Sequence, residues 1–157
     1  CGAYRYDLRW LAAEGENCDT EDCIFIMLNP STADAFKLDP TNRRCFDFTR
    51  REGAKYMYVL NVFAYRATDP RDMKAHEDPV GPENDNYLRR VLARAKARKS
   101  KLICAWGAHG AHRGRSDKVR HMIAEAGVEA HCFGYTKAGE PKHPLYLRKD
   151  LPLVPFQ

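Results

Sequence analysis

Four apolar runs of strand length alternate with amphipathic helical patterns along the chain. The runs cover residues 23–28, 56–63, 101–106 and 128–135. Between them, apolar residues recur at helical spacing over residues 42–52, 84–100 and 116–127. Strands that alternate with helices favour βαβ units and a parallel sheet, and nearly continuous apolar strands favour a sheet covered on both faces. The sequence therefore predicts an α/β fold with three layers, α/β/α, in which the central layer is a four-stranded, mostly parallel sheet.

The helix boundaries carry their own signals. Thr41 or Asn42 is expected to cap the first helix, and Gly53 to end it. Asn84 and Ser116 are expected to cap the second and third helices. Residues 4–10 alternate in character and predict an additional N-terminal edge strand.

A length of 157 residues predicts a single domain, residues 1–157. Within it, residues 1–22 form the N-terminal edge strand and a loop, and residues 23–135 form the α/β core. Residues 136–157 are rich in proline and are expected to lie over that core as an irregular segment.

Composition and charge limit the partners that the protein is expected to have. No apolar run approaches the roughly 18 residues that a membrane span needs, and the first residues do not resemble a signal peptide, so we expect a cytoplasmic protein with no membrane partner. A net charge of +5 permits a nucleic acid or nucleotide partner without requiring one. The six cysteines include no C-x-x-C pair, so we expect no metal site and no cofactor.

Polar loops follow all four apolar runs. In a parallel sheet the carboxyl ends of the strands share one edge, and ligands bind outside that edge. The loops would bring amides, hydroxyls, imidazoles, guanidiniums and aromatic rings together, which suits a flat polar ligand that can carry a phosphate. The loops are residues 29–34, 61–70, 106–115 and 134–146.

Each loop taken alone has a simpler interpretation. Asn29-Pro30 is a common turn, Trp106 fits a core position, and the basic residues between 89 and 101 fit the solvated face of a helix as well as a nucleic-acid surface. Arg113 and Arg115 fit either an anion site or surface charge. A metal-dependent nuclease remains a further alternative, with ligands drawn from Asp34, Asp69, His109 and His112.

The loops as a set resemble a bacterial and phage family, domain of unknown function 1643. The resemblance covers about residues 4–147 and rests on the segments MLNPSTAD, DPTNRRC, NVFAYRATDP, GPENDNYL, AWGAHG and GYTKAGEPKHPLYL. The family implies no activity.

The order of motifs also resembles the uracil-DNA glycosylase superfamily, which has a four-stranded parallel α/β/α fold. Residues 27–31 are similar to the G-[IL]-N-P-G motif of its mismatch-specific branch, and Leu60-Asn61, Trp106-Gly107 and His143-Pro144 are similar to its later motifs. The chain departs from that pattern in several ways. It lacks the catalytic Asp of the most active branches, has Ser31 in place of Gly, has no Ser after His-Pro, and lacks the iron–sulfur cysteines.

That resemblance implies an enzyme that cleaves an N-glycosidic bond or acts on a nucleobase. Asn29 would hold the water, and His143 would donate a hydrogen bond to the leaving base. Asn61 would read the base edge. The other implied roles are substrate binding by Ser31, Thr32, Asp34, Phe36, Phe63, Tyr65 and Trp106, phosphate binding by Arg66, Arg113, Arg115 and Lys137, and a wedge of Leu145 and Tyr146 for a flipped base.

The sequence leaves two other classes of protein as alternatives. A non-catalytic nucleic-acid or nucleotide binding protein, for example in phage or mobile-element DNA modification, would need the same loops but no ordered water. A structural or partner-binding protein would use none of the loops, although dense polar loops at strand ends usually carry function.

Overall fold

The computed structural model describes residues 2–13, 20–31 and 37–157, and within these it forms one mixed six-stranded sheet. The order is β1-β3-β2-β4-β5-β6. The four inner strands pair in parallel, and the two outer strands pair antiparallel to their neighbours. The bounds are β1 Leu8–Leu11, β2 Thr20–Met27, β3 Ala54–Asn61, β4 Lys101–Cys104, β5 Ala130–Cys132 and β6 Val154–Pro155.

The predicted α/β class is confirmed, and the sheet has six strands where the sequence predicted four plus an N-terminal edge strand. That edge strand is β1, in which Leu8 pairs with Val59 of β3. The sixth strand, β6, comes from the proline-rich C-terminal segment and pairs with β5. Pro155 lies at the outer edge of the sheet, where a residue without a backbone N–H is tolerated.

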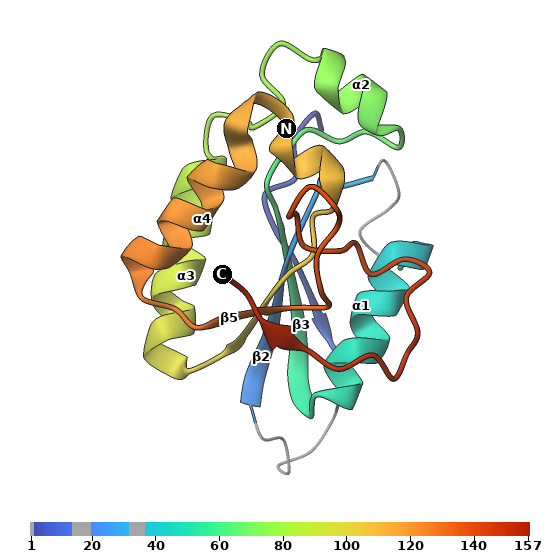
Figure 1. Cartoon of the computed structure of the whole chain (residues 1–157), viewed down its shortest axis with the longest axis vertical. Coiled ribbons are helices and arrows are strands. Elements are labelled where there is room, and N and C mark those ends of the chain that lie inside the picture. Colours follow the sequence, from blue (N-terminus) through green and yellow to red (C-terminus); the bar gives the residue numbers. More distant parts are fainter. Residues whose placement is uncertain (1, 14–19, 32–36) are drawn as a thin grey trace.

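Helices cover both faces of the sheet (Figure 1). The α3 and α4 helices pack on one face, where they meet Ile24 and Ile26 of β2. On the other face α1 packs against Phe25 and Met27 of the same strand. The alternation follows from the period-two geometry of a strand. The bounds are α1 Pro40–Arg51, α2 Pro70–Ala75, α3 Asn84–Arg98, the 3-10 segment η1 Ala108–Gly114, and α4 Arg115–Ala126.

The predicted N-caps are wrong at each of the three main helices, whereas Gly53, with a φ of 72° directly after the C-cap Glu52, ends α1 as predicted. Asp39 caps α1 by accepting a hydrogen bond from the backbone N–H of Asn42 at 2.7 Å, and Pro40 occupies the first helical turn. Asp followed by Pro is a stronger start than the predicted Thr41 or Asn42, because proline loses no hydrogen bond there. Asn84 and Ser116 lie in the first turns of α3 and α4, after the N-caps Glu83 and Gly114, and their side chains bond to other parts of the fold.

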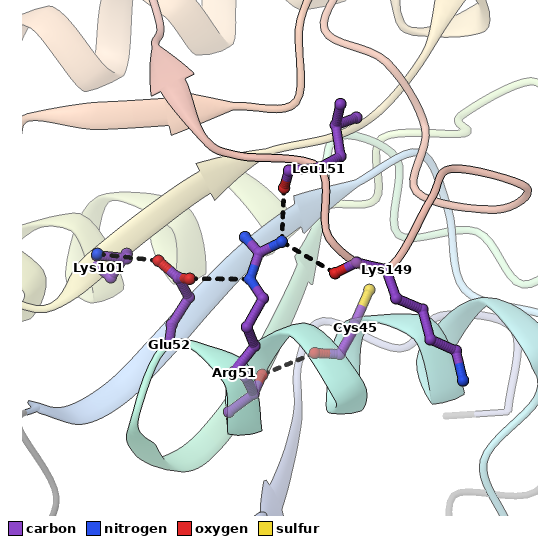
Figure 2. A network of polar contacts seen from close by, with 7 residues as sticks. Cys45, Arg51, Glu52, Lys101, Lys149 and Leu151 are labelled. Carbon is purple, nitrogen blue, oxygen red and sulfur yellow. Dashed lines mark hydrogen bonds and ion pairs between the residues drawn. The ribbon is translucent and has the colours of Figure 1, made fainter.

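The C-terminal segment runs beside α1 (Figure 1). Arginine side chains of the helix bind its backbone. Figure 2 shows Arg51 donating to the backbone carbonyls of Lys149 and Leu151 while it also pairs with Glu52 at 3.0 Å. Two turns earlier on the same face of α1, Arg44 donates to the carbonyl of Leu147. The helix therefore fixes the chain just beyond residues 143–145, which enter the candidate site.

Among the described residues, no helix combines the length and the apolar character that crossing a membrane requires.

Candidate functional site

A cavity of about 270 Å³ opens where β2 and β3 end and α1 begins. Segments far apart in the sequence meet in its wall, as predicted for loops at the carboxyl ends of parallel strands. Its apolar lining includes Met27, Leu28 and Val59. Its polar and charged lining is Arg5, Asn29, Ser31, Asp39, Thr41, Asn42, Asn61, Thr68 and His143.

Asn61, the last residue of β3, has the most informative side chain in the wall. The residue is only 4% exposed and lines the cavity. Asn84 fixes its position by donating to the backbone carbonyls of Asn61 and Val62 at 2.9 and 3.2 Å. Within residues 2–13, 20–31 and 37–157, the Asn61 side-chain amide itself has no hydrogen-bond partner. A buried amide is normally satisfied, so this donor and acceptor are available to a ligand or to water in the cavity.

His143 faces the same cavity from the C-terminal loop. Its Nδ1 accepts a hydrogen bond from the backbone N–H of Leu145 at 3.3 Å, so the proton of the neutral ring lies on Nε2. Burial lowers the pKa of His143 below its ordinary value, and the negative charge of Asp39 opposes the shift. His143 is therefore a neutral, pre-oriented hydrogen-bond donor.

Asp39 supplies a carboxylate to the cavity that sequence reasoning missed. Its Oδ2 accepts a hydrogen bond from the Ser31 hydroxyl at 2.8 Å, and its Oδ1 accepts the capping bond from Asn42. The Asn42 side chain also donates to Oδ2 at 3.5 Å. A carboxylate has about four acceptor positions, so acceptor capacity remains beyond these described bonds. The signal was present in Asp39-Pro40, a strong helix start, but a capping role alone does not predict that the residue lines a ligand cavity.

Arg5 also lines the cavity and was not predicted to do so. Burial lowers the pKa of Arg5, and the charge of Asp39 acts in the opposite direction. A guanidinium remains charged at any physiological pH. Among the residues that the structure describes, the wall thus combines one cation and one anion with neutral amides and hydroxyls, which suits a polar ligand of low net charge.

Asn29 lies in the cavity wall, but its side-chain N–H groups are occupied. They donate to the carbonyls of Ala67 at 2.8 Å, Pro30 at 3.1 Å and Tyr65 at 3.4 Å. The bonds to Ala67 and Tyr65 join the loop after β2 to the loop after β3. Its Oδ1, which accepts no hydrogen bond within the described part of the chain, is the atom left to bind water.

Two residues predicted to bind substrate lie in the protein core. Phe63 is fully buried, and Trp106 is 1% exposed. The Trp106 indole donates to the carboxylate of Glu140, which also accepts from Ser116 at 3.0 Å. Trp106 therefore anchors the loop that leads to His143 and does not line the cavity.

The predicted phosphate-binding residues are dispersed. Arg115 is 4% exposed, pairs with Asp85 at 2.7 Å and donates to the carbonyl of Val62, so it has a structural role. Arg113 donates to the carbonyls of Glu77 and His76 beside α2. Lys137 is exposed on the loop after β5, outside the cavity.

The remaining predicted residues that the structure describes line the cavity or a neighbouring groove, or adjoin a residue that does. Leu145 lines the cavity, and the adjacent Tyr146 is 91% exposed with a φ of 70°. A bulky residue at positive φ is uncommon and strained, and such residues cluster at functional sites. Tyr65 and Arg66 line a neighbouring groove. Thr32, Asp34 and Phe36 lie outside the described residues.

No group of three or more His, Cys, Asp or Glu side chains in the described part of the chain is arranged to hold a metal ion. Asp69, a proposed ligand of the nuclease alternative, caps α2 and pairs with Arg71 at 2.8 Å.

Comparison with known proteins identifies the family and leaves the activity open. No curated protein and no solved structure matches the chain. The family model described as a protein of unknown function, DUF1643, matches residues 5–145. The chain therefore belongs to the DUF1643 family.

Proposed function

We propose that this protein hydrolyses the N-glycosidic bond of a nucleoside unit in a nucleic acid or a nucleotide. The observation that carries the proposal is the Asn61 side chain, which is 4% exposed, lines the cavity and has no partner within the described residues. An amide presents a donor beside an acceptor, and nucleobase edges present the complementary pair. Asn61 would pair with the base edge.

The rest of the wall supplies what cleavage of this bond needs. The reaction passes through a cationic sugar and an anionic base. Asp39 would stabilise the sugar cation and accept a proton from the attacking water, whose oxygen forms the new bond to the anomeric carbon. The Nε2–H of His143 would donate to the base as the carbon–nitrogen bond breaks. Asn29 Oδ1 would help to orient the water.

The architecture supports the resemblance to the uracil-DNA glycosylase superfamily. The inner strands run parallel, helices cover both faces, and the segments similar to the superfamily motifs at Asn29, Asn61 and His143 meet in one cavity. If the substrate is duplex DNA, the exposed Tyr146 beside the cavity would fill the gap that a flipped base leaves.

The decisive experiment is a base-release assay with matched variants. Wild type is incubated with nucleosides, nucleotides and oligonucleotides that carry uracil, mismatched or modified bases, and the freed base is measured by chromatography. Asp39→Asn keeps a good helix cap while it removes the charge, so its turnover should fall by about a hundredfold or more with little loss of stability. Asn61→Ala should abolish binding without unfolding the protein.

Asn29→Ala is a poor test of mechanism, because it also removes two hydrogen bonds that hold two loops together. The same bonds favour the second candidate, a non-catalytic nucleotide-binding protein, since the predicted water-holding amide already has structural partners. Binding that requires Asn61, with no base released by wild type from any substrate, would establish this second candidate and refute hydrolysis.

A further inference from the structure

An open groove continues from the cavity across the loop after β3. The groove has a volume of about 500 Å³ and is lined by residues of this loop and of α2. Ala67 and Thr68 line both the cavity and the groove. A ligand that fills the cavity therefore has a direct path over these two residues into the groove.

The shared loop is held rigidly, so the path has a fixed shape. The backbone N–H groups of Tyr65, Arg66 and Ala67 donate to the carbonyls of other segments at 3.1, 2.9 and 3.0 Å. From the cavity side, Asn29 donates to two carbonyls of the same loop. Every one of these bonds joins segments distant in sequence, which makes the loop a preformed ridge between two subsites.

The groove presents an aromatic surface and charged groups. The rings of Tyr65 and His76 stack with centroids 3.8 Å apart, and Tyr4 packs edge-on against both. Both rings of the stack are half-buried, and Arg66 lies beside them in the groove wall. Aromatic rings next to a guanidinium are the usual elements for stacking a base and holding its phosphate.

Asp72 stands in the groove wall as well. A carboxylate repels phosphate and accepts hydrogen bonds from amino groups, so it favours the base over the phosphate on that side. The mixed lining thus matches a whole nucleotide, with its base and phosphate on different sides, better than a free anion.

We propose that this groove is a second subsite, which binds the nucleotide adjacent to the one in the cavity. The protein's ligand is then a nucleic-acid strand of at least two units and not a free nucleoside. This inference rests on the proposed function, because it takes the cavity to hold a nucleoside unit.

The test compares a mononucleotide with a dinucleotide that contains it, each as a competitor against a fluorescently labelled single-stranded oligonucleotide in anisotropy titrations. We expect the dinucleotide to bind wild type at least about tenfold more tightly, as gaining one stacked base usually gives. His76→Asn should remove most of that gain. Asparagine can still accept the hydrogen bond that His76 Nδ1 receives from Asp78 N–H, so the turn is retained while the ring is lost.

Arg66→Gln should also reduce the gain, and Arg71→Gln is its matched control. Arg71→Gln removes the same positive charge from a nearby position. The Arg71 side chain, however, is 89% exposed, pairs with Asp69 and lies outside the groove lining. Urea midpoints establish that each variant is folded.

The outcomes separate the two proposals. Equal affinity of wild type for mononucleotide and dinucleotide, or a gain that survives in both His76→Asn and Arg66→Gln, overturns the second subsite and leaves the cavity's proposed function intact. If wild type binds no nucleotide or oligonucleotide at all, both proposals are overturned.

Discussion

Gly110 is the position where one added methyl group should do the most damage. It lies in η1 directly over the buried Trp106. A Cβ atom at residue 110 would lie 2.1 Å from Trp106 Cδ1 and 2.8 Å from Cγ and Nε1. Ordinary carbon–carbon contacts are about 3.5–4.0 Å, so the indole or the segment above it must move by about 1.5 Å.

Neither movement is cheap, because the indole is enclosed and its N–H donates to the buried carboxylate of Glu140. Overpacking a well-packed core costs about 1–3 kcal/mol. Losing a hydrogen bond to a charged group adds about 1.5–3 kcal/mol. We therefore expect Gly110→Ala to lower the free energy of unfolding by about 3–5 kcal/mol, a large share of the stability of an ordinary domain.

Urea unfolding followed by tryptophan fluorescence and circular dichroism measures this loss. Gly2→Ala is the matched control, because no atom lies within 4 Å of its added Cβ, and it should change stability by less than about 0.5 kcal/mol. In a Trp106→Phe background the cost of Gly110→Ala should shrink, since the smaller ring makes no bond to Glu140. A loss below about 1 kcal/mol in the wild-type background would refute the reasoning.

Three further predictions concern residues around the site. Asp85→Asn should lower the free energy of unfolding in urea by about 3 kcal/mol, because Arg115, which is 4% exposed, then lacks its anionic partner. A loss below about 1 kcal/mol would contradict a buried ion pair. Burial lowers the pKa of His143, so protonation of this residue favours the unfolded chain. As the pH falls below about 6.5, the unfolding free energy of wild type should therefore decrease more steeply than that of His143→Asn. Above this pH the two proteins should show the same dependence of stability on pH. Asn61→Ala should change the unfolding free energy by less than about 1 kcal/mol despite its burial, because the amide has no described partner to lose; a cost above about 2 kcal/mol would show that its role is structural.

Much of the fold follows from local patterns in the sequence. Runs of strand length and helical spacing predict the four inner strands and three main helices, because side-chain period and backbone geometry are linked over short distances. The convergence of Asn29, Asn61 and His143 followed from the parallel arrangement of those strands. Helix caps were placed less well: Asp39 was overlooked in favour of residues two and three positions later.

The functions of individual polar residues were harder to predict. Arg113 and Arg115 look alike in sequence, yet Arg115 is buried against Asp85 while Arg113 braces the turn after α2. Asn29 and Asn61 each lie at the carboxyl end of a strand, yet the side chain of Asn29 donates to three backbone carbonyls and the side chain of Asn61 has no described partner. Whether a side chain has a partner depends on segments tens of residues away.

The sequence by itself determined the α/β class and the edge of the sheet at which polar loops gather, since both depend on periodicity and on where apolar runs end. Only the tertiary structure decided which polar groups face the cavity, because burial and hydrogen bonding are set by contacts between distant segments. Thus Arg5 reaches the cavity from the N-terminal segment and Asp39 from a helix cap. Trp106, which ends a predicted strand, is instead enclosed by η1 and Glu140.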